Sequence, residues 1–438
     1  MERHAFDALD AWRQDPSRKP LVVRGARQVG KTWLLREFGR ARYEQVVYLN
    51  CQRDPIAAVF EGDLDPGRIL RGLEIAARAT IDPATTLLVL DEIQDVPAAL
   101  TALKYFAEEA PELHLATAGS LLGVALRAQA SFPVGKVDFL DLHPLDFDEF
   151  LRGTGEAQLA DAVAVQDWNL IRSFRDRLTE RLRTYMFVGG MPEPVARYAE
   201  GSSLDSVRAI QLNIVRGYQS DFAKYADPNV SRRIAQVWAS MPAQLARENK
   251  RFVFGHVRKG GRGRDFEDAI QWLADAGLVH KVTRYTKPAS PVRTYEDSSI
   301  FKLYLLDVGL LGALAQLDPA VLLDGTGIFE EFKGALTEQY VLQQIVAARN
   351  EVPMYWSPEK PTAEVEFAIE RAGALVPIEV KAGENLRSKS LRSYVDRFAP
   401  SAALRFSLAD YREEADLTNV PLYAIGPLLS ERGAAAAG

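Results

Sequence analysis

Two glycines separated by four residues, followed at once by a lysine and a threonine, constrain the fold of this chain most strongly. The segment is Gly25–Thr32, which reads G-x-x-x-x-G-K-T. Residues 21–25 are apolar and β-branched and predict a short buried strand, while residues 31–39 predict a helix that ends near Gly39. The order of strand, glycine loop and helix predicts an α/β fold built around a P-loop.

A loop of this kind suits a polyphosphate. Glycines allow successive backbone N–H groups to point inward, and the helix N-terminus adds partial positive charge. We expect Lys31 to reach the β- and γ-phosphates of ATP and the Thr32 hydroxyl to bind Mg²⁺. The alternative is a glycine turn that precedes a helix by chance. The residues predicted to bind the nucleotide are Gly25, Ala26, Arg27, Gln28, Val29, Gly30, Lys31, Thr32 and Trp33.

A second motif follows about sixty residues later. Residues 85–95 form an apolar strand that runs directly into Asp91 and Glu92. An acidic residue at such a strand end holds Mg²⁺ in P-loop enzymes, so we expect this role for Asp91. Glu92 is expected to polarise the attacking water. Residues 113–119 predict a further strand, and Ser120 after it is a candidate sensor of the γ-phosphate, although serine after glycine is common in turns.

The strand predicted at 45–51 lies between the two motifs in the sequence. A strand at this position, together with the glutamate that follows Asp91, is typical of ATPases whose sheet has an additional central strand. The sequence contains no N-K-x-D-like segment of the kind that reads guanine, so ATP is preferred to GTP.

Length and charge limit the remaining possibilities. A chain of 438 residues predicts two to four domains. The net charge of −6 argues against a protein that coats nucleic acid indiscriminately, but it permits a local basic patch. Cys51 is the only cysteine, which excludes an intrachain disulfide. No stretch has the roughly 18 uninterrupted apolar residues of a membrane span, and the N-terminus lacks the apolar core of a signal peptide, so we expect a cytoplasmic protein without a membrane partner.

The order of several motifs resembles that of a known family. They are "RQVGKT", "LDEIQ", "ATAGSLLG" (116–123), "HPLDFDEFL" (143–151), "VGGMPEPV" (188–195) and "FKLYLLDVGLL" (301–311). In this order they resemble prokaryotic AAA-type ATP-binding proteins with a DUF4143 C-terminal region. The resemblance implies an AAA-type core at 1–155, a helical lid at 156–225, a winged-helix-like domain at 226–325 and a nuclease-like α/β domain at 326–438.

The resemblance also implies an oligomer, with a hexameric ring expected, because AAA-type cores commonly complete their sites across subunits. Family members often carry an arginine before the "HPLDFDEFL" segment that could serve a neighbour's nucleotide. This chain has Lys136 there, and lysine lacks the planar guanidinium fork. Arg127 is a possible substitute, with a solvated helix arginine as the alternative.

The middle of the chain carries a candidate DNA contact. Residues 246–264 contain seven basic residues and one acidic residue, and they precede a predicted helix at 265–276 and a strand that begins a hairpin. This order is typical of a winged helix, in which the helix would occupy the recognition position. A solvated loop or a protein-contact module are the alternatives. The candidate DNA-binding residues are Arg258, Lys259, Arg262 and Arg264.

The C-terminal region resembles the core of PD-(D/E)-x-K nucleases. Glu379 and Lys381 are two residues apart on a predicted strand and therefore point to the same side. In that core two carboxylates bind Mg²⁺ and the lysine orients or activates water. The candidates here are Glu366, Glu379 and Lys381, with Glu338 from a preceding helix. Glu366 departs from the aspartate of related domains, so an active nuclease, a degenerate docking domain and a purely structural E-x-K pair all remain open.

Taken together, these features predict an ATP-hydrolysing motor that acts on duplex or branched DNA, such as a Holliday junction, with ATP and Mg²⁺ as cofactors. Two other functions fit the same motifs. One is a nucleotide-controlled protein switch or toxin-like assembly, in which the winged helix contacts protein. The other is an ATP-gated, Mg²⁺-dependent nuclease.

Overall fold

The chain folds into two compact units in a computed structural model that describes residues 2–120, 122–124, 135–247, 250–319, 330–358 and 363–430. The N-terminal unit comprises residues 2–143 together with Asp275–Gly277. The C-terminal unit comprises Pro144–Ala274 and the chain from Leu278 onward.

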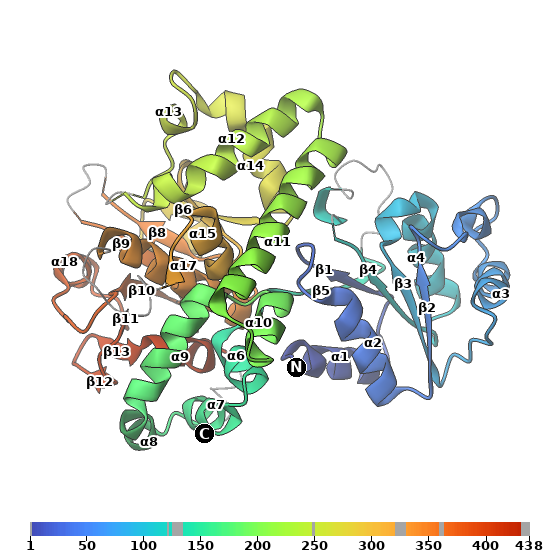
Figure 1. The fold of residues 1–438 in the computed structure, drawn as a ribbon, viewed down its shortest axis with the longest axis horizontal. Helices are drawn as coiled ribbons and strands as arrows, with labels where there is room; N and C mark the ends of the chain where they lie inside the picture. Colours follow the sequence, from blue (N-terminus) through green and yellow to red (C-terminus); the bar gives the residue numbers. More distant parts are fainter. Residues whose placement is uncertain are drawn as a thin grey trace. The chain divides into compact units, whose positions relative to one another are not determined.

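The N-terminal unit is built on a parallel sheet of five strands in the order β2-β3-β4-β1-β5 (Figure 1). The strands are β1 (Leu21–Arg24), β2 (Gln45–Asn50), β3 (Thr86–Asp91), β4 (His114–Ala118) and β5 (Asp138–Asp141). The helices are α1 (Ala5–Gln14), α2 (Lys31–Arg42), α3 (Pro66–Ala77) and α4 (Pro97–Glu109), with 3₁₀ turns η1 (Ala57–Phe60) and η2 (Ile93–Asp95).

Helices cover both faces of this sheet, as expected for strands that read as continuous apolar runs. All six residues of β3 are buried. One face packs against α3 and α4 in a single apolar core that includes Leu88, Leu90, Leu73 and Phe106. The other face meets α2, which packs in turn against α1. This arrangement places the carboxyl ends of β1 and β3 at one edge of the sheet, where the nucleotide motifs begin.

Two details of this unit differ from the sequence-based expectation. The strand inserted between β1 and β3 is β4, whereas β2 lies at the edge of the sheet and pairs only with β3 among the described strands. The prediction that residues 45–51 supply the added central strand is therefore wrong, because strand order along the chain does not determine which strands pair. The helix α2 also continues to Arg42 and does not end near Gly39.

The first half of the C-terminal unit is helical. Its helices are α6 (Phe147–Gly153), α7 (Ala157–Ala164), α8 (Trp168–Ser173), α9 (Arg175–Val188), α10 (Pro192–Ala199), α11 (Leu204–Tyr225), α12 (Pro228–Leu245), α13 (Phe254–Val257) and α14 (Gly263–Asp275). The predicted break at Gly189–Gly190 is confirmed, since α9 ends at Val188 and α10 begins at Pro192. The helix expected at 265–276 begins two residues earlier, at Gly263.

The second half contains a mixed sheet of eight strands in the order β12-β13-β11-β10-β9-β8-β6-β7. The strands are β6 (Val279–Tyr285), β7 (Glu296–Leu305), β8 (Met354–Trp356), β9 (Val365–Arg371), β10 (Ala374–Val380), β11 (Leu404–Ser407), β12 (Arg412–Glu413) and β13 (Thr418–Pro421). The accompanying helices are α15 (Val308–Leu314), α17 (Glu330–Arg349), α18 (Lys389–Phe398) and α19 (Ile425–Leu429), with 3₁₀ turns η3 (Val292–Tyr295) and η5 (Leu422–Ala424). The hairpin β6–β7 expected of a winged helix joins this sheet through parallel pairing of β6 with β8.

Three of the sequence motifs, at 143–151, 188–195 and 301–311, meet at the buried carboxylate of Asp307. Its Oδ2 accepts a hydrogen bond of 2.6 Å from Gly190 N, and its Oδ1 accepts one of 2.9 Å from Leu310 N. Gly190 O in turn accepts from Leu145 N at 2.7 Å. At Gly189, where φ is +74°, a Cβ atom would lie only 2.3 Å from Asp307 Oδ1. The paired glycines therefore allow the backbone to approach this carboxylate closely.

The helix α17 adds side-chain amides to the same region. Gln343 donates from Nε2 to Asp307 Oδ2 at 3.1 Å and accepts from Val308 N at 2.9 Å. Gln339 bonds both backbone groups of Leu305, at 2.9 and 2.6 Å. Buried amides satisfy backbone groups that would otherwise cost free energy in the interior. The polar face of α17 is thus an internal face, which explains why this helix has no clear apolar stripe.

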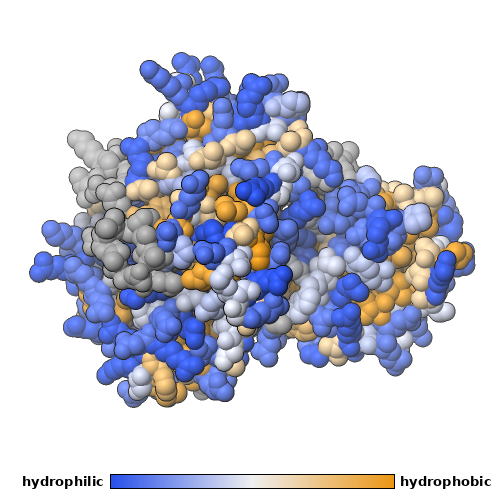
Figure 2. All heavy atoms as spheres, viewed as in Figure 1, coloured by the Kyte–Doolittle hydropathy of each residue, from blue (hydrophilic) through white to orange (hydrophobic). Residues whose placement is uncertain are grey.

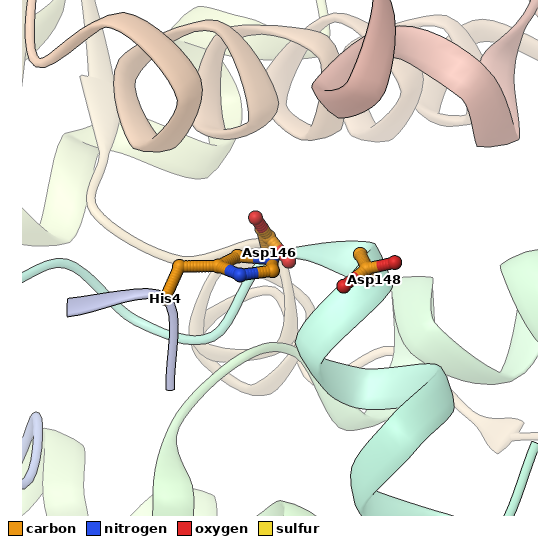
Figure 3. Close-up of side chains that lie close together, drawn as sticks. All are labelled: His4, Asp146 and Asp148. Atoms are coloured by element: carbon orange, nitrogen blue, oxygen red, sulfur yellow. The ribbon is translucent and has the colours of Figure 1, made fainter. Parts of the chain in front are cut away.

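The start of α6 is a capping box formed by Asp146 and Glu149. Figure 3 shows the side chains of Asp146 and Asp148 on this turn. Asp146 accepts from Glu149 N at 2.8 Å, and Glu149 accepts from Asp146 N at 3.1 Å. Asp148, on the first turn, pairs with Arg152 at 2.8 Å. The two capping-box hydrogen bonds satisfy amide groups that a helix start leaves without intrahelical partners.

Most of the surface in view is hydrophilic, with hydrophobic side chains in separate patches (Figure 2). Within the described part of the chain, no helix combines the length and apolar character needed to cross a bilayer.

We predict that Asp307→Asn destabilises the protein by about 2 kcal/mol, because the new amide group would leave a buried backbone donor facing another donor. The change should lower the unfolding temperature in calorimetry of the full chain. Asp396→Asn, at an exposed position of α18, is the matched control and should leave that temperature unchanged. An Asp307→Asn protein as stable as the parent would contradict the stabilising role assigned to the hydrogen bonds that Asp307 accepts.

Candidate nucleotide-binding site

The loop between β1 and α2 has the backbone of a phosphate cradle. Gly25, Gln28 and Gly30 all have positive φ, at 146°, 68° and 96°. A Cβ atom at position 25 would lie 2.3 Å from Leu142 O, so only glycine fits there without a shift of the backbone. The loop leads directly into the N-terminus of α2. The free amide groups and the partial positive charge of this helix start favour binding of an anion.

Lys31 lies inside this loop. Its Nζ donates to Gly25 O at 2.9 Å and to Ala26 O at 2.8 Å, and the residue is only 6% exposed. Burial lowers the pKa of Lys31 to about 8, against the opposing charges of Glu92 and Asp91. The loop carbonyls thus hold the ammonium group in the cradle that the sequence assigns to phosphates.

Asp91 connects the two nucleotide motifs. Its Oδ2 accepts hydrogen bonds of 2.7 Å from the Thr32 hydroxyl and of 2.7 Å from the Tyr48 hydroxyl, and its Oδ1 accepts one of 3.0 Å from Glu92 N. The carboxylate is almost fully buried. A hydroxyl and a carboxylate in direct contact are the oxygen ligands that Mg²⁺ prefers, so this donor set fits the metal.

Glu92 occupies a strained position immediately after β3. Its φ and ψ are 50° and 43°, a left-handed conformation that is uncommon for a residue with a side chain. Gln94 Nε2 donates to Glu92 Oε2 at 2.6 Å. The backbone N and the Oγ of Ser120 donate to the same oxygen at 3.3 and 3.2 Å. These hydrogen bonds hold the carboxylate at the end of the sheet and help to maintain the strained backbone.

The structure thus brings together Lys31, Thr32, Asp91, Glu92 and Ser120, although Ser120 contacts the carboxylate of Glu92 and its predicted role toward phosphate stays a prediction. Trp33 is 41% exposed at the start of α2.

The motifs did not single out Tyr48 or Gln94. Tyr48 is close to Asp91 because Asn50, two residues further along β2, pairs with Asp91 in the sheet. Gln94 stands inside the "LDEIQ" segment, and this is the only sequence signal for it. Cys51 is buried beside this site, and burial, then the charge of Asp91, raises the pKa of its thiol to about 12, so it stays protonated.

The sequence gives Lys136 and Arg127 as candidates for contact with the nucleotide of a neighbouring subunit. Lys136 pairs with Glu108 of its own chain at 2.8 Å, and both side chains are partly exposed. Arg127 lies outside the described residues.

The four candidate DNA-binding residues, Arg258, Lys259, Arg262 and Arg264, are all exposed around the start of α14. Arg258 lies 3.6 Å from Asp265 and its guanidinium stacks over the ring of Phe266. Lys250, also one of the seven basic residues of this stretch, belongs elsewhere, because its ammonium pairs with Glu338 at 2.7 Å. Lys250 is therefore not part of the exposed basic segment, which contains fewer residues than the sequence suggests.

The predicted nuclease-like residues also come together. Lys381 pairs with Glu379 Oε1 at 2.8 Å, and Val380 N donates to Glu366 Oε2 at 3.2 Å. Desolvation, together with the charge of Glu338, raises the pKa of Glu366 to about 8.

Family models match three consecutive parts of the chain. An AAA domain matches residues 17–151, which contain the loop, Asp91 and Glu92. A domain of unknown function, DUF4143, matches residues 333–425. The chain carries an AAA-type ATPase domain and a C-terminal DUF4143 region. Another domain of unknown function, DUF8612, matches residues 179–321 between them. No functionally curated protein matches the chain.

Solved structures similar to this ATPase include the Walker-type ATPase PABY2304 of Pyrococcus abyssi. It has 14% identity over 72% of this chain and 95% of that protein, with a TM-score of 0.45. The ORC1 protein of Aeropyrum pernix, solved in complex with DNA, has 14% identity over 72% of this chain and 93% of that protein, with a TM-score of 0.28. Similarity at this level carries no information on substrate or partner.

We predict that the affinity for ATP falls above pH 8. Phosphates stabilise the charged form of Lys31, so its pKa in the complex must exceed the value of about 8 in the free protein. Binding then takes up a proton once the pH passes 8, and the Kd should rise by about tenfold per pH unit until the pKa of the complex is reached.

Titration of the full chain with a fluorescent ATP analogue between pH 7 and pH 9.5 measures this dependence. Lys104→Met, which changes an exposed lysine of α4 outside the loop, should show the same rise as the parent. A Kd that stays constant across this range would show that Lys31 does not meet the phosphates.

Proposed function

We propose that this AAA-type ATPase is a motor that binds ATP and Mg²⁺ on the Gly25–Thr32 loop and uses hydrolysis to move or remodel duplex or branched DNA, such as a Holliday junction. The proposal of ATP hydrolysis rests on the hydrogen bond from Thr32 to Asp91, next to a Glu92 carboxylate that is held by hydrogen bonds. The basic segment at the start of α14 supports the DNA part.

The residues of the loop and of β3 have distinct tasks in this proposal. Lys31 and the amide groups of the loop bind the β- and γ-phosphates, while Thr32 and Asp91 would hold Mg²⁺, which neutralises phosphate charge when bound. Glu92 orients the attacking water and accepts its proton. The three hydrogen bonds to Glu92 all fall on Oε2, so we assign this task to Oε1.

The basic segment is better suited to contacting the phosphates of DNA than to reading its bases. The four basic residues are exposed, and Arg258 also lies against Asp265 and Phe266 of α14. The surface around α13 is hydrophilic (Figure 2). The four residues are Arg258, Lys259, Arg262 and Arg264. The exposed residues of the first turns of α14 include Glu267 and Asp268, which would repel a DNA backbone. We therefore propose that the segment contacts the DNA backbone without reading sequence, which suits a motor that must act at many sites.

We also propose that the ATPase assembles as a homo-oligomer, with six subunits in a ring. An exposed ion pair such as Lys136–Glu108 contributes about 0–1 kcal/mol, so Lys136 can leave it to reach a neighbour's nucleotide at little cost. Mass photometry with Mg²⁺ and a non-hydrolysable ATP analogue reports the number of subunits.

We predict that duplex or four-way-junction DNA stimulates ATP turnover, and that Lys259→Ala with Arg262→Ala weakens this stimulation. Losing two phosphate contacts should lower the slope of log affinity against log salt by about 2. Arg71→Ala with Lys104→Ala removes the same charge from exposed positions of α3 and α4 and is the matched control. Glu92→Gln protein, which should hydrolyse ATP about 10²–10⁴-fold more slowly, gives the baseline.

Turnover that no DNA stimulates, with normal basal hydrolysis, would overturn the motor proposal. That result would favour a nucleotide-controlled switch whose winged-helix-like segment contacts protein.

A further inference from the structure

The C-terminal unit contains an acidic cluster of four glutamates on α17, on β9, on β10 and immediately before β9: Glu338, Glu366, Glu379 and Glu364. The antiparallel register pairs Ile378 with Phe367, which sets Glu379 and Glu366 opposite each other on one face of the sheet. Glu338 and Glu379 are buried, at 8% and 1% exposure. Like charges placed this closely need a cation, and in a PD-(D/E)-x-K nuclease that cation is Mg²⁺.

Here the cations come from the protein itself. The Lys302 ammonium, fully buried on β7, pairs with Glu364 and also lies within electrostatic range of Glu338 and Glu366. Although burial opposes its charge, these three carboxylates raise the pKa of Lys302, so it remains protonated. Lys302 also lies over the ring of Tyr355, with Nζ 4.8 Å from the ring centroid.

Other groups occupy most of the remaining carboxylate oxygens. Lys250 Nζ lies 2.7 Å from Glu338 Oε1, and the Tyr304 hydroxyl donates to Glu338 Oε2 at 3.0 Å. Lys381 pairs with Glu379 Oε1. Glu379 Oε2 is buried without a hydrogen-bond partner in the described structure. Mg²⁺ requires near-octahedral oxygen coordination and usually keeps several waters. The Glu338 oxygens are already bonded, and three ammonium groups would repel a divalent ion, so the cluster does not fit Mg²⁺.

The charges of the cluster also nearly balance without a metal. Four carboxyl groups face three ammonium groups, and each ammonium group forms an ion pair with one of the carboxylates.

We propose that Lys302, assisted by Lys250, is a built-in counter-ion of the acidic cluster and takes the role that a divalent cation has in nucleases of this fold. The C-terminal domain is then a metal-free domain, and its acidic residues connect β7 to the start of β9 and the segment after α12 to α17. This inference does not depend on the DNA-motor proposal, because it concerns residues outside the nucleotide site.

The first test counts bound Mn²⁺ by electron paramagnetic resonance on the full chain without nucleotide. The parent and the Glu366→Gln/Glu379→Gln protein should bind the same number of ions, since any ion at the nucleotide site is common to both. An ion bound by the parent and lost in that variant would overturn the proposal. This comparison needs no lysine variant.

The second test removes the counter-ion. Lys302→Met keeps the apolar stem of the side chain but leaves buried carboxylates uncompensated, so the unfolding temperature should fall. Mn²⁺ should then bind as one additional ion and raise that temperature again, and Glu379→Gln in the same chain should abolish both effects. Lys281→Met, on β6 of the same hairpin, should gain no ion. A Lys302→Met protein that is folded but gains no Mn²⁺ would contradict the role assigned to Lys302.

Discussion

The carboxylate of Asp91 is the point on which the nucleotide site depends. It accepts hydrogen bonds from Thr32 at the start of α2 and from Tyr48 on β2, so three elements that are distant in sequence converge on one buried charge. The same strand end places Glu92 in a left-handed backbone conformation that its hydrogen bonds to Ser120 and Gln94 help to maintain. Because Asp91 and Glu92, to which we assign the metal and the attacking water, are adjacent residues, displacement of β3 would disturb both carboxylates at once.

The C-terminal unit is organised by buried charges of a different kind. Within the described residues Asp307 accepts hydrogen bonds from neutral backbone and amide groups, which stabilise the carboxylate, whereas burial raises the pKa of its carboxyl group. Glu338 is neutralised by an ammonium group, since Lys250 and Lys302 lower its pKa against the effect of burial. Both carboxylates connect segments that the sequence assigns to different domains. The motif residues Gly189, Gly190 and Asp307 therefore have a structural role, because they join these segments. Part of the similarity of this sequence to its family thus reflects how the segments pack.

Local features of the site could be predicted from the sequence, and contacts between distant segments could not. The strand, loop and helix around Gly25–Thr32 follow from neighbouring residues, as does the position of Glu379 and Lys381 on one side of a strand. The insertion of β4 between β1 and β3 depends on pairing between distant strands. Lys250 is 88 residues from Glu338, and Lys302 is 62 residues from Glu364. Nothing in the basic stretch around Lys250 distinguishes that residue from its solvent-exposed neighbours.

The Mg²⁺ dependence of ATP affinity in variants of Thr32 tests the central claim most directly. If the Thr32 hydroxyl and Asp91 hold the metal beside the phosphates, Mg²⁺ will tighten ATP binding in the parent and in Thr32→Ser protein but not in Thr32→Val protein, which keeps the side-chain shape without the hydroxyl. Equal tightening by Mg²⁺ in all three proteins would contradict the account and place the metal elsewhere.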